Sequence, residues 1–196
     1  MRGEIEAHFR TLGDFGPKIE ATDRDGARLP LGEATTRALQ AAERAKRERL
    51  RVFFIGNGGS AGICSHMATD WMKNGGFSAL AFNDGSALTC VGNDLGFDQV
   101  FAKPLEMHGR KDDLLIAISS SGNSPNILRG VEAARAAGLQ VVTLSGFKPD
   151  NRLRRLGEVN FYVPSERYGF VEISHLVICH AILDLSMGMA LAENVK

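Results

Sequence analysis

RVFFIGNGGSAGICSHMATD, at residues 51–70, sets the architecture of this chain. The apolar run at residues 52–55 is typical of a strand that is buried on both faces, as in a parallel sheet. A glycine-rich turn follows at residues 56–59, and a helix is predicted to begin at Ser60. Glycines let the backbone approach a ligand closely, and the free N–H groups of a first helical turn attract anions. The stretch therefore predicts a strand–turn–helix unit with an anion site.

The same helix carries a possible metal or acid/base pair. His66 and Asp70 are four residues apart and share one helical face. Glu172 and His180, eight residues apart, share a face of a predicted C-terminal helix. The four side chains suit Zn²⁺, which accepts imidazole and carboxylate ligands, and they equally suit acid/base chemistry without a metal. Helical pairs with this spacing also arise by chance, so the residues alone leave these interpretations open.

A second polar loop, SSSGNS at residues 119–124, follows a predicted strand and precedes a helix that begins at Pro125. Its hydroxyl and backbone N–H groups can hold a phosphate without Lys or Arg. Ser124 is also placed to cap the following helix. Ligands of parallel sheets bind beyond the carboxyl ends of the strands, where both polar loops are expected. The two loops together therefore predict a phosphate site.

Strands and helices alternate along the rest of the chain, which predicts an α/β fold with a doubly wound, five-stranded parallel sheet. Residues 1–50 are interpreted as an N-terminal helical extension and residues 51–196 as the α/β core of one domain. In the extension, helices are predicted at residues 3–20 and 31–50, with a loop at residues 21–29. The strands of the core are expected at residues 52–55, 78–83, 114–118, 140–144 and 159–163, with a last long helix at residues 171–193.

Composition narrows the function classes. The 23 basic and 23 acidic residues balance, so no field of one sign is available to attract nucleic acid or a membrane surface. Three scattered cysteines without a CxxC pair indicate a reduced, intracellular protein. No apolar stretch approaches the roughly 18 residues of a membrane span, and the N-terminus lacks a signal-peptide core. We therefore expect a cytoplasmic protein.

Six segments carry a resemblance to a known family. They are GNGGSA at 56–61, HMATD at 66–70, VGNDLGFDQVF at 91–101, ISSSGNSPNIL at 118–128, VVTLSG at 141–146 and HLVICH at 175–180. In this order they resemble the SIS (sugar isomerase) family of phosphosugar-binding domains, and most closely its phosphoheptose isomerase branch. The resemblance implies a flavodoxin-like SIS sandwich and a homotetramer with sites at subunit interfaces. It also implies a phosphorylated sugar as substrate and one Zn²⁺ per subunit.

The resemblance further implies a role for each residue that matches the family motifs. Phosphate would be held by Ser60, Ser119, Ser120, Ser121 and Ser124. Sugar contacts would come from Asn57, Gly58, Gly59, Asn93 and Asp94, and also from Glu172. The metal ligands would be His66, Asp70, Glu172 and His180. Asp70 and His180 would be the catalytic acid/base pair.

The chain departs from the family pattern at several of these positions. Asp70 stands where the family has Glu, Glu172 where it has Gln, and Ile63 where it has Asp. The activity implied is interconversion of D-sedoheptulose 7-phosphate and a D-glycero-D-manno-heptose 7-phosphate by metal-assisted proton transfer. Two alternatives follow from the departures. One is a catalytically impaired SIS domain that binds sugar phosphates or a protein such as a replication initiator, and the other is an isomerase of a different sugar phosphate.

Overall fold

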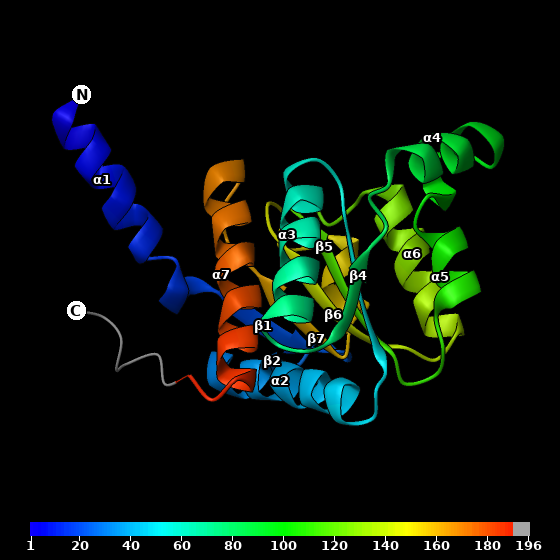
Figure 1. The fold of residues 1–196 in the computed structure, drawn as a ribbon. Helices are drawn as coiled ribbons and strands as arrows, with labels where there is room; N and C mark the ends of the chain where they lie inside the picture. The colour runs from blue at the N-terminus through cyan, green and yellow to red at the C-terminus, as the bar shows by residue number, and fades with distance from the viewer. Residues whose placement is uncertain (190–196) are drawn as a thin grey trace.

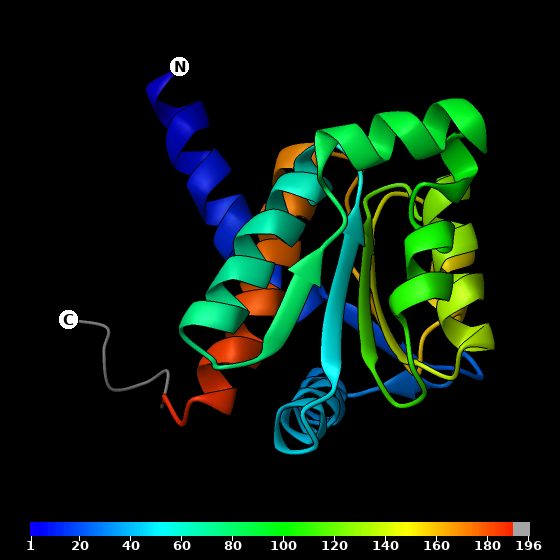
Figure 2. The same cartoon turned by 45° about the vertical axis from the view of Figure 1, so that its right-hand side comes forward.

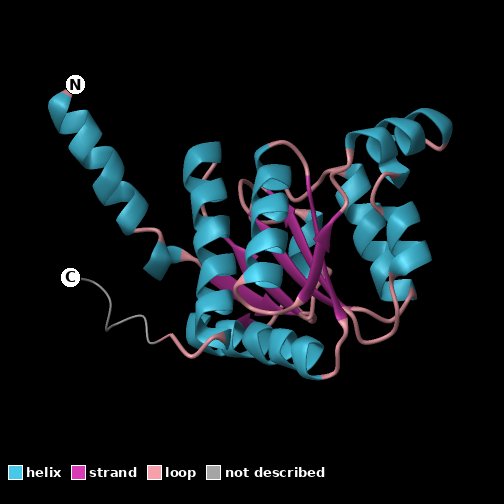
Figure 3. Cartoon of the chain, viewed as in Figure 1, coloured by secondary structure: helices cyan, strands magenta, loops and turns pink. Residues whose placement is uncertain are grey.

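Strand β3 (Arg51–Gly56) lies next to the last strand of a seven-stranded sheet with the order β2-β1-β7-β6-β5-β3-β4. The structure, a computed structural model, describes residues 1–189 (Figures 1 and 3). Five neighbouring strands pair in parallel, as predicted: β3 with β4 (Ser78–Ala81), then β5 (Leu114–Ser119), β6 (Gln140–Ser145) and β7 (Val159–Tyr162). Their order is that of a flavodoxin-like sheet, which confirms the predicted fold class.

Helices cover both faces of this sheet, which Figure 2 shows nearly edge-on. Val52 and Phe54 of β3 belong to the core on one face, whereas Phe53 and Ile55 belong to the core on the other. All four side chains are fully buried, which explains why residues 52–55 are all apolar rather than apolar at alternate positions. The first face is covered by α2 (Leu31–Arg47), α3 (Gly59–Lys73) and α7 (Tyr168–Ser186), and the second by α5 (Ala102–His108) and α6 (Pro125–Ala136).

The prediction of a loop at residues 21–29 is wrong. Residues 20–29 form a hairpin of β1 (Glu20–Asp23) and β2 (Arg28–Leu29), and β1 pairs antiparallel with β7, so the sheet has seven strands rather than five. The turn is closed by the Asp23 carboxylate, which accepts hydrogen bonds from the N–H groups of Asp25 and Ala27. The hairpin is short and polar because it lies at the edge of the sheet, and such a strand carries little hydrophobic pattern.

The first and last predicted helices differ from their predicted bounds. Helix α1 (Arg2–Gly13) ends early and is followed by the short helix η1 (Gly16–Lys18). Helix α4 (Gly85–Asp94) follows β4, and the short helix η2 (Phe97–Gln99) leads into α5. Another short helix, η3 (Arg152–Arg155), precedes β7. The last helix ends at Ser186, and residues 190–193 of its predicted range lie outside the described residues.

Helix α7 is long and apolar enough to cross a membrane by length and composition alone, with a mean hydropathy of 1.4. In the fold it packs against α2 and α3. Side chains from three of its turns, including Val171, His175 and Ile182, are almost completely buried. The core helix of a folded domain has the same composition as a membrane span, so this stretch is weak evidence for one.

Candidate functional site

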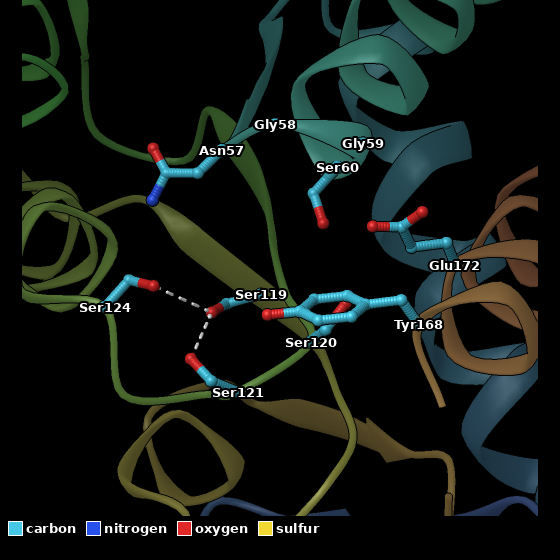
Figure 4. A pocket seen from close by; sticks show the side chains of 10 residues that line it. All are labelled: Asn57, Gly58, Gly59, Ser60, Ser119, Ser120, Ser121, Ser124, Tyr168 and Glu172. Atoms are coloured by element: carbon cyan, nitrogen blue, oxygen red, sulfur yellow. Dashed lines mark hydrogen bonds between the residues drawn. The ribbon is translucent and has the colours of Figure 1, made fainter. Parts of the chain in front are cut away.

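A cavity of about 220 Å³ lies at the carboxyl ends of β3 and β5 (Figure 4). The chain leaves β3 toward β4 on one side and returns to β5 on the other, so the strand order reverses here. Ligands of open α/β sheets bind at such a switch point. The lining residues are Asn57, Gly58, Gly59, Ser60, Ser119, Ser120, Ser121, Ser124, Tyr168 and Glu172. All of them except Tyr168 are among the residues that the sequence singled out. We call this space the serine cavity.

Hydroxyl groups converge on one wall of the serine cavity. Ser119 Oγ lies 3.5 Å from Ser121 Oγ and 3.4 Å from Ser124 Oγ (Figure 4). Ser124 is the N-cap residue of α6, but its side chain makes no capping bond, contrary to expectation. Ser120 Oγ is buried and has no partner among the described residues. Because a buried polar atom without a partner costs about 1–3 kcal/mol, this wall is suited to a ligand that supplies acceptors.

The opposite wall is the start of α3. Gly58 has a φ of +53°, a conformation that side chains other than glycine rarely adopt. A Cβ atom at Gly59 would collide with the carboxylate of Glu172, so only glycine leaves room for that side chain. The positive end of the α3 dipole faces this wall and favours an anion. The lining contains no Lys or Arg, and Glu172 is its single charged residue.

Asn57 is hydrogen-bonded to Asn126, a residue that the sequence motifs did not indicate. Its side-chain amide donates to Asn126 Oδ1 at 2.9 Å, and the amide of Asn126 donates back to Asn57 Oδ1 at 2.8 Å. Asn126 is buried near the start of α6. This reciprocal pair links the glycine loop to the serine loop and therefore sets the width of the cavity. An amide directly after the helix-starting Pro125 was the only signal of it in the sequence.

A second group of chemically capable side chains joins the middle of α3 to α7. His66 Nε2 lies 3.4 Å from His180 Nε2 and 3.5 Å from Asp70 Oδ2. One ligand atom from each of the three residues lies within 4.8 Å of the others. We call these residues the His–Asp–His cluster. Although Asp70 is one methylene shorter than the Glu that the resemblance implies at this position, its carboxylate reaches His66.

The His–Asp–His cluster is a group of side chains that could hold a metal ion, and two of its distances suit tetrahedral coordination. Zn²⁺ binds nitrogen and oxygen at about 2.0–2.2 Å, which places tetrahedral ligand atoms about 3.3–3.6 Å apart. Both short distances in the cluster lie in that range. Glu172, also expected as a ligand, does not belong to this group in the described part of the chain, because its carboxylate lies against Gly59 in the serine cavity.

Asn93 and Asp94 lie elsewhere. Both are at the end of α4, which Figure 1 shows beside α6 rather than beside α7. The Asn93 amide donates to Asp94 Oδ1 at 2.8 Å, and neither residue lines the serine cavity. Within one chain, the structure does not bring these two predicted sugar contacts to the other site residues.

His175 anchors α7 between the two regions. Its ring is completely buried, and Nε2–H donates to the Ser145 carbonyl at the end of β6, at 3.1 Å. Burial disfavours the charged imidazolium and lowers the pKa of His175 to about 4. The residue is therefore neutral at neutral pH and serves to hold α7 against the sheet.

Known proteins match this chain over most of its length. Residues 32–146 match the SIS domain family. The phosphoheptose isomerase of Helicobacter pylori (strain HPAG1) is 36% identical over 68% of this chain and 72% of its own. The phosphoheptose isomerase of Edwardsiella ictaluri (strain 93-146) is 39% identical over 69% of this chain and 72% of its own length. Among solved structures, the phosphoheptose isomerase of Neisseria gonorrhoeae superposes with a TM-score of 0.83 and 30% identity, over 95% of this chain and 98% of that one.

The superposition extends beyond the matched sequence. The phosphoheptose isomerase of Francisella tularensis gives a TM-score of 0.79 at 26% identity, over 95% of this chain and 97% of that one. The shared region therefore includes the hairpin and the helices that surround the two groups described above. The chain belongs to the SIS domain family, and within that family it is most similar to the phosphoheptose isomerases.

Proposed function

We propose that this chain is an aldose–ketose isomerase that interconverts D-sedoheptulose 7-phosphate and D-glycero-D-manno-heptose 7-phosphate. One observation carries the proposal. A cavity built for an anion and a cluster of acid/base side chains lie on the same two helices, α3 and α7. A sugar phosphate needs both features, one for its phosphoryl group and the other for the carbon that exchanges a proton. The phosphoheptose isomerases that the chain resembles support the choice of a seven-carbon substrate.

The serine cavity would hold the phosphoryl group. Hydroxyls of Ser119, Ser121 and Ser124 already converge, and a phosphoryl oxygen would give Ser120 Oγ the acceptor that it lacks. Main-chain N–H groups at the start of α3 would complete the site. Binding at this end of the substrate then supplies energy for positioning the other end.

The His–Asp–His cluster would transfer the proton. Isomerisation removes a proton from the carbon beside the carbonyl and protonates the carbonyl oxygen to give an enediol. The other enediol oxygen then loses its proton to become the new carbonyl, as a proton is returned to the former carbonyl carbon. Asp70 and His180 are the proposed acid/base pair, since each can accept and donate a proton. His66, Asp70 and His180 are also the proposed ligands of a Zn²⁺ ion, which when bound polarises substrate oxygen. Glu172, in the cavity, is proposed to contact the sugar.

We further propose a cytoplasmic homotetramer with sites at subunit interfaces. Two observations support association. Ile5 and Phe9 are exposed on α1, which stands away from the sheet (Figure 1). An assembly that placed α4 of one subunit near the serine cavity of another would also bring Asn93 and Asp94 to the sugar. The buried free thiols of Cys64 and Cys179 suit a reducing compartment. Native mass spectrometry tests the assembly, and a monomer would overturn it.

The activity is tested with the purified full chain loaded with Zn²⁺ and given sedoheptulose 7-phosphate. We expect a heptose 7-phosphate to form, detected by NMR, and one Zn²⁺ per chain in the isolated protein. Asp70→Asn is the matched variant, because it keeps the size of the side chain and removes its basicity. Absence of turnover by the zinc-loaded chain would contradict the proposal. Phosphate binding without turnover and without metal would indicate a sugar-phosphate-binding protein instead.

A further inference from the structure

Tyr168 is the one lining residue of the serine cavity that the motifs do not explain. It is the first residue of α7, and its ring extends into the cavity between Glu172 and the serine loop, with the hydroxyl on the side of Ser119 (Figure 4). The phenol hydroxyl has no hydrogen-bond partner among the described residues, and 62% of the residue is exposed. The exposed hydroxyl is therefore available to a ligand that enters the cavity.

The other tyrosine of the chain provides a contrast. Tyr162 is buried at the end of β7, and its hydroxyl donates to the Phe147 carbonyl at 2.8 Å. One phenol is therefore part of the folded core, with its donor satisfied. The other presents a free donor to a cavity whose remaining donors are hydroxyls and N–H groups.

Phe147 positions the Tyr168 ring. The two rings make an edge-to-face contact with centroids 4.9 Å apart and an interplanar angle of 77°. Phe147 has a φ of +57°, a left-handed conformation that costs a residue with a side chain about 1–2 kcal/mol. Its N–H donates to the Ser165 carbonyl, and its own carbonyl accepts from Tyr162. Hydrogen bonds at its N–H and at its carbonyl therefore hold Phe147 in this strained conformation, in which its ring contacts Tyr168.

We propose that Tyr168 is a ligand-binding residue of the serine cavity and that its hydroxyl donates a hydrogen bond to the phosphoryl group held there. This inference rests on the proposed function, since it assumes an anion in the cavity. The lining offers no cation, so each additional O–H donor matters for an acceptor that carries two negative charges. Phe147 limits the motion of the ring, which reduces the entropy lost when the ligand binds.

Calorimetric titration of the full chain with inorganic phosphate tests the inference without needing turnover. Tyr168→Phe removes one oxygen and keeps the ring on Phe147, and we expect it to weaken phosphate binding about tenfold, as the loss of a hydrogen bond to a charged group does. Ser186→Ala removes a hydroxyl at the other end of α7, and we expect it to keep the affinity within about twofold, because this hydroxyl donates to the Leu183 carbonyl outside the cavity. Equal affinity of Tyr168→Phe and the unaltered chain would overturn the inference.

A spectroscopic readout separates contact from an indirect effect. With ¹³Cζ-labelled tyrosine the chain gives signals from Tyr162 and Tyr168, its two tyrosines, and Tyr162→Phe assigns them. Saturating phosphate is expected to shift the Tyr168 signal and leave the Tyr162 signal in place. In steady-state kinetics Tyr168→Phe should raise KM about tenfold with little change in kcat.

The outcomes distinguish this inference from the function on which it rests. Phosphate binding with no shift at Tyr168 would overturn the role of the phenol and leave the phosphate site standing. No phosphate binding by the unaltered chain would overturn the phosphate site, and the role of Tyr168 with it. Thermal unfolding of both variants checks folding, and the exposed position of Tyr168 predicts a midpoint close to that of the unaltered chain.

Discussion

The serine cavity and the His–Asp–His cluster share helices α3 and α7, but they are built in different ways. The cavity is made of loops that directly follow β3 and β5, and its donors are neutral hydroxyls and main-chain N–H groups. The cluster is made of titratable side chains from the middle of two helices that are more than 100 residues apart in the chain. The backbone of two loops fixes the first region, whereas the second is completed only when α7 packs on α3 and brings His180 to His66 and Asp70. We infer that the cavity binds and the cluster reacts.

The largest expected effect tests whether the His–Asp–His cluster carries out the reaction. His180→Asn should lower kcat for sedoheptulose 7-phosphate by about 10³-fold and change KM little, because a positioned acid/base group contributes about 10²–10⁴-fold. Steady-state kinetics of the zinc-loaded enzyme measures it. Asp184→Asn, one turn further along α7 and outside the cluster, is the matched control. A rise in KM with unchanged kcat would instead assign His180 to binding.

The next effect concerns His175, which holds α7 between the two regions. Its pKa is lowered from 6.5 to about 4 in the fold, so the unfolded chain binds the extra proton between these values. Its contribution to the free energy of unfolding is complete above about pH 6.5 and is lost as the pH falls toward 4, by about 3 kcal/mol in total. Urea unfolding at several pH values measures the loss.

His175→Gln is the comparison for this measurement, because it removes the imidazole titration and leaves the surface carboxylates unchanged. We expect it to lower stability at neutral pH and to flatten the dependence on pH relative to the unaltered chain. If the free energy of unfolding changed with pH equally in both proteins, His175 would not be an anchor of α7. If it is an anchor, the serine cavity and the cluster are expected to lose their geometry together as the pH falls to about 4, where the buried imidazole takes up its proton.

A smaller effect tests whether the serine cavity binds the phosphoryl group. Ser119→Ala removes the hydroxyl at the centre of the serine wall, and we expect both KM and the Kd for inorganic phosphate to rise about tenfold while kcat changes little. Ser186→Ala, whose hydroxyl donates to Leu183 at the end of α7, is the control. A fall in kcat as large as that of His180→Asn would mean that the two regions do not divide binding from chemistry.

The smallest effect concerns the single charge of the cavity. Glu172→Gln keeps the shape beside Gly59 and removes a negative charge, so we expect phosphate to bind a few-fold more tightly. Calorimetry with phosphate and with sedoheptulose 7-phosphate measures the two affinities separately. Weaker binding of the sugar phosphate with tighter binding of phosphate would assign the carboxylate to the sugar hydroxyls. Weaker binding of both would contradict a repulsive role.

The parts of the fold that were predicted correctly carry strong local signals. Strand β3 is apolar at each of residues 52–55 because it is covered on both faces, and the same holds for residues 114–118 of β5. The hairpin β1–β2 was missed because edge strands can be short and polar. Tyr168 and Asn126 were missed for a related reason. Tyr168 meets the other lining residues of the serine cavity only through the packing of α7, and Asn126 meets Asn57, which lines it, only where α6 lies beside the glycine loop.

Helical spacing placed His66 with Asp70, and Glu172 on the same face as His180, but it could not say which pairs meet. The packing of α7 against α3 joins His180 to His66 and Asp70 and leaves Glu172 beside Gly59 at the mouth of the cavity. A residue's own neighbours in the chain set strand, turn and helix, because these depend on short-range sterics and hydrogen bonds. Which side chains of two distant helices touch depends on how both pack on the sheet, and that contact exists only in the folded molecule.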